Sequence, residues 1–540
     1  MPPEPGPPTL SAARCNGQVI AALLAELDRL GVNEFCVAAG ARNAPLLEVL
    51  QRREDFTIYP FVEERSAAFF ALGRIMDACR PVSVVTTSGT AVAELFPAVM
   101  EAYYQALPLV AVTADRPSRY RGSGAPQAVE QPGIFGEYVC RSLELEHDGT
   151  GMFESEDVGP ETGPIHINVC LEECLAEIDI VEPDEVRLRD APRMDGGCHD
   201  SGWEKFFQSA GGLIVLAAGI HPQDVPAALD FLLRLGAPVV AEATSNLLAD
   251  PVLQPLLRRG GERALAACTA TRVIRLGCVP SWRWWRDLEA REDVAVLNIS
   301  RAPFRGLARD TNVTTLAWEA LETPAFQRPP SFGESQLPSS VDCEINLAAA
   351  LEAHPRSEPA WMRHLSRVIG PASHVLLGNS LPIREWNLAA DRPQPGVSFF
   401  ANRGANGIDG LVSTWLGLSA EVDASWLIIG DLSTIYDLGA PWILPHLFHR
   451  PRRIVIINNG GGKIFSRLGW LKQAGKGTHE LMVNPHGISF EPWARMWGMG
   501  YHLIEEPATL PTDQGLNCQV WEIRPDPEQT EAFWVRWQRK

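Results

Sequence analysis

Short apolar runs alternate with longer amphipathic stretches along most of this chain, and many of the runs end in turns of glycine and polar residues. Gln18 to Leu30 has the spacing of an amphipathic helix, and the apolar run that follows it is typical of a strand. Strands are predicted at residues 35–38, 82–86, 109–113, 164–169, 213–216, 239–241, 273–276, 294–297, 375–377, 398–400, 426–429, 454–457 and 520–523. Because strands and helices alternate, the pattern predicts an α/β fold with parallel sheets.

The chain has 540 residues, which is too long for a single hydrophobic core. Residues 183–202 and 324–340 are polar and rich in proline, glycine and charge, so we interpret both stretches as linkers. We therefore predict three doubly wound parallel-sheet domains, at residues 1–182, 203–325 and 341–540.

Polar side chains follow two of the predicted strands at the point where each strand ends. Gly430-Asp431-Leu432-Ser433 follows one apolar run, and Asn458-Asn459-Gly460-Gly461 follows the next. Asp431 and Asn459 are 28 positions apart, enough for one βαβ unit, which brings both side chains to the same edge of a sheet. Carboxylate, amide and backbone carbonyl oxygens suit Mg²⁺, which often shares its ligands with phosphates. The alternative is two ordinary strand ends with polar turns.

A second candidate is the carboxylate of Glu64, where charged residues enter a helix of small and apolar residues that continues to Gly73. A carboxylate is rarely placed there without a partner. The alternative is a solvated helix N-terminus, where the helix dipole favours an acidic residue. Glu63 is the next candidate if the register differs by one residue.

The amino-acid composition and net charge indicate which kinds of binding partner to expect. Hydrophobic residues make up 46% and charged residues 21% of the chain, as in an ordinary globular protein, and the net charge of −19 argues against nucleic acid or an anionic membrane as a partner. An anionic substrate would need a local cluster of arginines. We expect no membrane insertion and a cytoplasmic location, because the start lacks a signal sequence and the eleven cysteines have no CxxC spacing. His166, Cys170 and Cys174 are not predicted to bind metal, because a strand runs through them.

Several further motifs follow in a fixed order along the chain. They are Gly40-Ala41-Arg42, Glu63-Glu64-Arg65, the segments 87–93, 113–117 and 124–133, Gly378-Asn379-Ser380, the segment 402–410, Gly430-Asp431-Leu432-Ser433, Tyr436-Asp437-Leu438, Asn458-Asn459 and Ile464-Phe465. Together they resemble the 2-succinyl-5-enolpyruvyl-6-hydroxy-3-cyclohexene-1-carboxylate (SEPHCHC) synthase family (MenD) of thiamine diphosphate (ThDP) enzymes. This resemblance implies pyrimidine-binding, central and diphosphate-binding domains, in that order.

The resemblance also implies the reaction and the cofactor site. The family joins 2-oxoglutarate to isochorismate with loss of CO₂, in menaquinone or phylloquinone biosynthesis. Glu64 is implied as the catalytic residue that activates ThDP. The residues implied to contact the cofactor are Glu64, Ile408, Gly430, Asp431, Leu432, Ser433, Asn459 and Gly461. Mg²⁺, or Mn²⁺, is implied on Asp431, Asn459 and the carbonyl of Gly461.

Both implied substrates are dianions, and the planar arginine side chain pairs well with carboxylates. The substrate residues implied by the resemblance are Arg42, Arg116, Gln127, Arg283, Ser380, Arg384, Arg403, Ile464, Phe465 and Leu468. Arg384, Arg403 and Ser380 are assigned to 2-oxoglutarate. Arg42, Gln127 and Arg283 are assigned to isochorismate, and the last three residues of the list to an apolar wall. Taken singly, each arginine is a candidate surface salt-bridge residue, and Leu468 a candidate core residue.

The resemblance implies a homodimer or homotetramer with active sites at the subunit interface. The chain departs from the family pattern at Ala41, where serine is usual, at Trp284, where several relatives carry a second basic residue, and at Gly460, where asparagine is frequent. The alternatives are therefore a related ThDP carboligase with another acceptor, or a ThDP-fold scaffold without catalysis.

Overall fold

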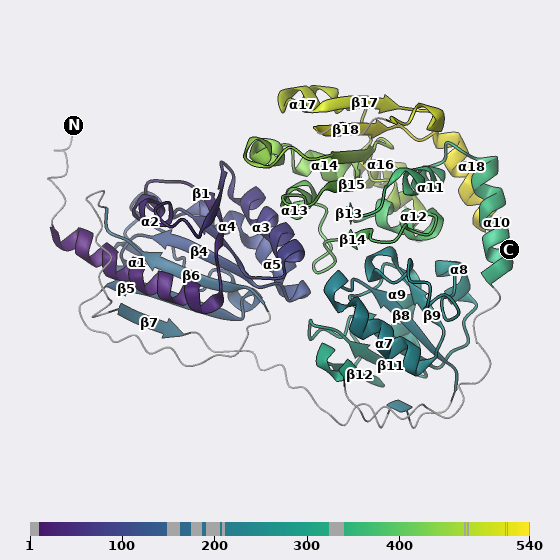
Figure 1. Cartoon of the computed structure of the whole chain (residues 1–540), viewed down its shortest axis with the longest axis horizontal. Coiled ribbons are helices and arrows are strands. Elements are labelled where there is room, and N and C mark those ends of the chain that lie inside the picture. Colours follow the sequence, from purple (N-terminus) through teal and green to yellow (C-terminus); the bar gives the residue numbers. More distant parts are fainter. Residues whose placement is uncertain are drawn as a thin grey trace. The chain divides into compact units, whose positions relative to one another are not determined.

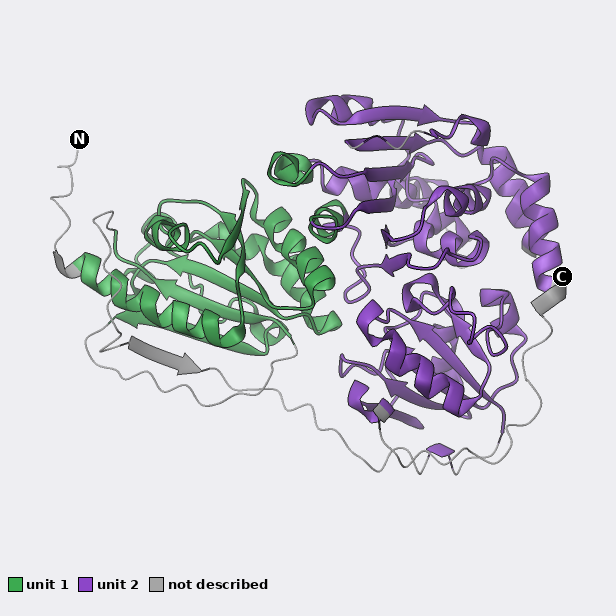
Figure 2. Cartoon of the chain, viewed as in Figure 1, with its two compact units in different colours: residues 1–195, 412–420, 439–448 green, residues 196–411, 421–438, 449–540 purple. Residues whose placement is uncertain are grey.

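Three sheets with flanking helices make up the computed structural model of the chain (Figure 1). The structure describes residues 10–147, 163–173, 186–190, 206–207, 211–322, 340–468, 471, 475–512, 515 and 517–538. It divides into two compact units: unit 1 is residues 1–195, 412–420 and 439–448, and unit 2 is residues 196–411, 421–438 and 449–540 (Figure 2).

Unit 1 contains a seven-stranded sheet in the order β2-β1-β3-β4-β6-β5-β7. Its strands are β1 (Glu34–Ala38), β2 (Thr57–Phe61), β3 (Val82–Thr86), β4 (Leu109–Asp115), β5 (Arg141–His147), β6 (Ile165–Cys170) and β7 (Val186–Asp190). All neighbours are parallel except β5 and β7. The helices are α1 (Leu10–Leu30), α2 (Ala44–Leu50), α3 (Glu64–Ala78), α4 (Thr90–Glu94) and α5 (Phe96–Gln105). The apolar face of α1 packs with the sheet in one core, as its sequence predicts.

Helix α13 (Leu411–Leu418) crosses α3 closely within unit 1. A Cβ on Gly73 would lie 1.9 Å from the carbonyl oxygen of Thr414, and a Cβ on Gly417 would lie 2.1 Å from that of Phe70. Only glycine fits at both positions, because any side chain would overlap the backbone of the other helix. This contact holds the helix that starts at Glu64.

Unit 2 contains two parallel sheets. The five-stranded sheet has the order β12-β11-β10-β8-β9, with β8 (Leu213–Ala218), β9 (Val239–Ala241), β10 (Arg272–Gly277), β11 (Ala295–Ile299) and β12 (Val313–Leu316). Its helices are α7 (Val225–Leu235), α8 (Gly261–Ala266) and α9 (Arg283–Asp287). Two apolar clusters pack on it.

The six-stranded sheet has the order β14-β13-β15-β16-β18-β17. Its strands are β13 (Ser373–Leu377), β14 (Ser398–Phe400), β15 (Ala424–Gly430), β16 (Arg452–Ile457), β17 (Gly500–Ile504) and β18 (Cys518–Ile523). The helices are α10 (Ser340–Ala353), α11 (Glu358–Val368), α12 (Leu381–Ala389), α14 (Asp431–Tyr436), α15 (Ile464–Arg467), α16 (Lys476–Val483), α17 (Glu491–Met496) and α18 (Pro527–Gln538). Within the described residues, no helix has the length and apolar character needed to cross a membrane.

The α/β class and the parallel sheets are confirmed. The stretch predicted as a linker from residue 183 contains strand β7, which pairs antiparallel with β5. Three of the five residues in its sequence Val-Arg-Leu-Arg-Asp are charged, so an edge strand there resembles a polar linker. Cys174 and most of the stretch 324–340 lie outside the described residues.

Candidate functional site

The diphosphate half of the predicted site forms where β15 and β16 end side by side in unit 2. The two strands pair in parallel up to Gly430 and Ile457, and Asp431 follows directly as the first residue of α14. Asp431 is 3% exposed. Its Oδ2 accepts hydrogen bonds from the backbone N–H groups of Gly460 and Gly461, at 2.9 and 3.0 Å. The carboxylate therefore fixes the turn that follows β16.

The side chain of Asn459 is held by Glu358. Its Nδ2 donates to Glu358 Oε1 at 2.9 Å, and within the described residues its buried Oδ1 has no hydrogen-bond partner. Glu385, on α12, is a second buried acid beside Glu358. Burial raises the pKa of Glu358 to about 7, and burial and the charge of Glu358 raise that of Glu385. At neutral pH such a pair holds a proton.

His486 is a third side chain at this turn. Its Nε2 lies 3.3 Å from Asp431 Oδ2, and its Nδ1 accepts from the N–H of Ile488 at 3.2 Å. Because Nδ1 is an acceptor, the neutral ring carries its proton on Nε2, which makes no hydrogen bond among the described residues. Burial raises the pKa of Asp431.

These groups fit a divalent cation on a diphosphate. The orphaned Oδ1 of Asn459 and the carboxylate of Asp431 are oxygen ligands of the kind that Mg²⁺ takes. Gly461 has φ of 134°, a backbone conformation that favours glycine, and a Cβ at Gly430 would meet nothing within 4 Å. Leu432 donates its N–H to Asp431 Oδ1, and Ser433 is buried in α14 beside it.

The residues assigned to the donor substrate lie in the same unit. Arg403 donates from Nη1 to Asn379 Oδ1 at 3.3 Å, and its buried Nε has no hydrogen-bond partner among the described residues. Asn379 also donates to the carbonyls of Asn402 and Gly407 at 2.7 Å, so it holds the loop that leads to Ile408. Ser380 has φ of 75°, which is strained for a residue other than glycine.

Arg384, one turn into α12, interacts with Arg403. Burial and repulsion by Arg403 lower the pKa of the Arg384 guanidinium, although part of the side chain is exposed. The buried Glu242, after β9, accepts from the N–H and hydroxyl of Ser281 at 2.5 and 2.6 Å, and its Oε2 has no partner in the described part of the chain. Burial raises the pKa of Glu242, and attraction to Arg403 and Arg384 opposes this rise. Two cations and one acid therefore share this region.

Arg283, which the resemblance assigns to isochorismate, is largely exposed to solvent. It is 65% exposed on α9 and lies 3.6 Å from Asp287 in an ion pair. The charge of Arg286, three residues later, acts on Arg384, as do the charges of Arg403, Glu242 and Glu262. Ile464, Phe465 and Leu468 are partly exposed, the first two in α15 and the last directly after it.

In unit 1 the structure distinguishes Glu63 from Glu64. Glu63 is the N-cap of α3, and its carboxylate accepts from the N–H groups of Arg65 and Ser66 and from the Ser66 hydroxyl. Glu64 follows in the first turn and has no part in the cap. Burial, and repulsion by Glu63 and Glu94, raise the pKa of Glu64. Glu64 thus has the carboxyl that is available for chemistry.

Three of the implied substrate residues, Arg42, Arg116 and Gln127, lie in unit 1. Arg42 is 9% exposed, donates to the carbonyl of Leu171 at 3.1 Å, and feels the charge of Arg116. Arg116 Nε donates to the carbonyl of Pro126 at 3.1 Å, directly before Gln127. Gln127 is exposed and has φ of 57°.

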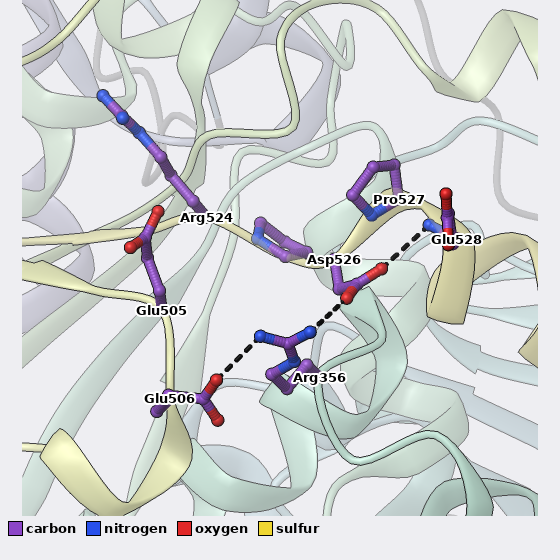
Figure 3. A pocket seen from close by; sticks show the side chains of 8 residues that line it. Arg356, Glu505, Glu506, Arg524, Asp526, Pro527 and Glu528 are labelled. Carbon is purple, nitrogen blue, oxygen red and sulfur yellow. Dashed lines mark hydrogen bonds and ion pairs between the residues drawn. The ribbon is translucent and has the colours of Figure 1, made fainter.

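A separate surface pocket of about 480 Å³ lies near the C-terminus and contains no predicted site residue. It is lined by Arg356, Glu505, Glu506, Arg524, Pro525, Asp526, Pro527 and Glu528. Arg356 bridges Glu506 at 2.7 Å and Asp526 at 2.5 Å (Figure 3). Its acidic lining does not suit a dicarboxylate.

Four residues near the site were not predicted from the sequence: Glu242, Glu358, Glu385 and His486. The motif Ser357-Glu358-Pro359 is an ordinary helix start, and only the burial of Glu358 shows that its carboxylate faces inward. A buried acid cannot be distinguished from a solvated one by its letter.

Comparisons with known proteins agree with this geometry. Residues 17–134 match the family model described as "Thiamine pyrophosphate enzyme, N-terminal TPP binding domain". The chain is 18% identical to a putative thiamin diphosphate-dependent enzyme from Mycobacterium smegmatis, covering 94% of this chain and 99% of that one, with a TM-score of 0.63. It is 16% identical to benzoylformate decarboxylase from Polynucleobacter necessarius, covering 95% and 98%, with a TM-score of 0.64. These two likenesses show the fold.

Two curated relatives are much closer in sequence, and both are named 2-succinyl-5-enolpyruvyl-6-hydroxy-3-cyclohexene-1-carboxylate synthase. The protein of Bdellovibrio bacteriovorus is 37% identical, covering 96% of this chain and 98% of its own. That of Akkermansia muciniphila is 39% identical over the same shares. The chain therefore belongs to the SEPHCHC synthase family of thiamine diphosphate-dependent enzymes.

Proposed function

We propose that this protein is a SEPHCHC synthase that joins 2-oxoglutarate to isochorismate with loss of CO₂, in menaquinone biosynthesis. The relatives that share its whole length support this proposal. The structural observation that carries it is the buried Oδ1 of Asn459, which has no partner among the described residues and directly precedes the turn held by the carboxylate of Asp431. A pair of oxygen ligands at adjoining strand ends is what a metal-bound diphosphate requires.

Asp431, Asn459 and the carbonyl of Gly461 would hold Mg²⁺ or Mn²⁺ on the diphosphate of ThDP. When bound, ThDP supplies the nucleophilic carbon and the electron sink for decarboxylation. Ile408 would support the cofactor, and Glu64 would exchange a proton with its pyrimidine ring. The raised pKa of Glu64 suits that exchange, because its carboxyl keeps a proton at a higher pH than a solvated glutamate does.

Arg403 and Arg384 would hold the carboxylates of 2-oxoglutarate, with Ser380 at the start of α12. The orphaned Nε of Arg403 supports this role, because a buried guanidinium N–H requires an acceptor. Arg42, Gln127 and Arg283 would hold isochorismate, and Arg116 would be a further substrate contact. Ile464, Phe465 and Leu468 would form the apolar wall.

We further propose the domain boundaries 1–182, 203–325 and 341–540, with β7 (Val186–Asp190) completing the sheet of the first domain, a cytoplasmic location, and a homodimer or homotetramer. The acidic net charge supports the absence of a nucleic-acid partner.

A related ThDP carboligase with a different acceptor is the second candidate. The exposed ion pair of Arg283 with Asp287 favours it, since this arginine is then not reserved for a substrate. Ala41 and Trp284 differ from the family pattern on the same acceptor side.

The test follows the disappearance of isochorismate by its ultraviolet absorbance. The proposal predicts consumption only when ThDP, Mg²⁺ and 2-oxoglutarate are all present, and none when pyruvate replaces 2-oxoglutarate. Release of CO₂ from 2-oxoglutarate while isochorismate stays intact would support the second candidate instead.

A further inference from the structure

A buried carboxylate from a distant helix determines how Asn459 is oriented. Glu358 opens α11, 101 positions before Asn459, and is 3% exposed. Its Oε1 accepts from Asn459 Nδ2 at 2.9 Å, while the buried Oδ1 of Asn459 accepts from no described residue. The two ends of the amide are thus distinguished: the nitrogen has a partner, and the oxygen is left for a group that the chain does not supply.

We propose that Glu358 is a positioning residue for the cation that binds beside Asp431. By accepting from Nδ2, it keeps the carbonyl oxygen of Asn459, and not the amide nitrogen, turned toward the metal. This inference rests on the proposed ThDP function. The terminal torsion of asparagine is broad and nearly two-fold, so without a fixed partner the side chain can present either end. A cation is attracted by the oxygen and repelled by the amide hydrogens.

Glu358 is held well enough for this role. Its N–H donates to Thr530 Oγ1 at 3.0 Å, and the Ser357 hydroxyl caps the same helix start by accepting from the N–H of Ala360 at 3.4 Å. The carboxyl of Glu385, from α12, is its neighbour in the interior. Three helices, α11, α12 and α18, therefore fix the acceptor.

The packing of α11 does not explain why an acid is buried here. Burying a carboxylate is costly unless it is hydrogen-bonded, and any helix-forming residue could open α11. The only hydrogen bond from a non-acidic side chain to the Glu358 carboxyl, within the described residues, comes from Asn459. The charge of Arg467 offsets part of this cost, and the remaining non-acidic partner of the carboxyl is the amide of Asn459, which is consistent with a role toward a metal.

The first test replaces Glu358 with leucine, which removes the acceptor, and with glutamine, which keeps one. The measurement is the Mg²⁺ dependence of ThDP binding by calorimetry, with the Tm of the cofactor-free protein alongside. Loss of a hydrogen-bond partner behind a metal ligand typically weakens metal affinity by about 10–100-fold, so we expect this for Glu358→Leu and nearly full affinity for Glu358→Gln. Thr530→Val is the matched control: it removes a contact to the backbone of the same helix start but keeps the carboxylate and its bond to Asn459, so it should change the affinity far less than Glu358→Leu does.

The second test exchanges donor and acceptor, and it stands even if Glu358→Leu does not fold. Asn459→Asp alone adds a third acid beside Glu358 and Glu385, so the new carboxylate is either repelled or shares a proton, and in both cases Mg²⁺ binding should weaken by about tenfold or more. Adding Glu358→Gln provides an N–H for the new carboxylate and should restore most of the affinity. Equal affinity of Asn459→Asp in both backgrounds, or unchanged affinity in Glu358→Leu, would overturn the inference. Wild-type protein that binds ThDP without any dependence on Mg²⁺ would instead refute the proposed function.

Discussion

Adjacent glutamates at the start of α3 give a sharp test of the cofactor-activating residue. Glu64→Gln keeps the size of the side chain but removes the carboxyl that exchanges a proton. General acid–base groups contribute about 10²–10⁴-fold, which corresponds to about 3–5 kcal/mol of activation free energy. We therefore expect turnover to fall by that factor, while ThDP binding and stability change little, because Glu64 takes no part in the helix cap.

Glu63→Ala is the matched control, and its expected effect is the reverse. It removes the acceptor for the N–H groups of Arg65 and Ser66, and loss of such a cap costs about 0.5–2 kcal/mol of stability. Turnover per folded molecule should stay near that of the wild type. The assays are initial rates of isochorismate loss at saturating ThDP, with urea unfolding measured in parallel. If Glu64→Gln kept wild-type turnover and Glu63→Ala lost it, the assignment of roles to the two residues would be wrong.

Three further predictions concern the substrates, the metal and pH. Arg403→Ala should block CO₂ release from 2-oxoglutarate in the presence of an artificial electron acceptor, since breaking a buried ion pair costs about 3–5 kcal/mol. Arg283→Ala should leave this step intact and impair only isochorismate addition. Equal effects of the two variants would contradict the assignment. Asp431→Ala should severely weaken Mg²⁺-dependent ThDP binding, because the metal loses its one anionic protein ligand, and unchanged affinity in calorimetry would refute this. Burial lowers the pKa of His166 from 6.5 to about 3, so as pH falls the unfolded chain binds a proton at this histidine before the folded chain does. The free energy of unfolding is therefore unaffected by this group above pH 6.5 and decreases between pH 6.5 and pH 3. Urea unfolding should show a loss of about 2 kcal/mol by pH 5 that His166→Gln lacks, and identical pH profiles would contradict it.

Much of the fold could be predicted because buried parallel strands are continuous apolar runs. The strands at 82–86, 239–241 and 398–400 have the predicted bounds. Strands β7 and β17 were missed because neither has such a run: three of the five residues of β7 are charged, and most residues of β17 are exposed.

Part of the site could likewise be predicted from the sequence, and the rest depends on contacts between distant segments. Strand-end residues such as Asp431 and Asn459 were predicted to lie close together because parallel topology requires it, and the turn of Gly460 and Gly461 on Asp431 confirms that proximity. Contacts across long separations, such as Glu358 to Asn459, follow from helix packing that no local pattern encodes. The choice between Glu63 and Glu64 likewise required the cap geometry.

The measurement that tests the central claim most directly is a product analysis. Purified protein is incubated with ThDP, Mg²⁺ and uniformly ¹³C-labelled 2-oxoglutarate, with and without isochorismate, and the mixture is examined by mass spectrometry. We predict labelled CO₂ and, only with isochorismate, a product with the mass of SEPHCHC that carries all the other labelled carbons. Labelled CO₂ with no such product, or no turnover of 2-oxoglutarate at all, would contradict it.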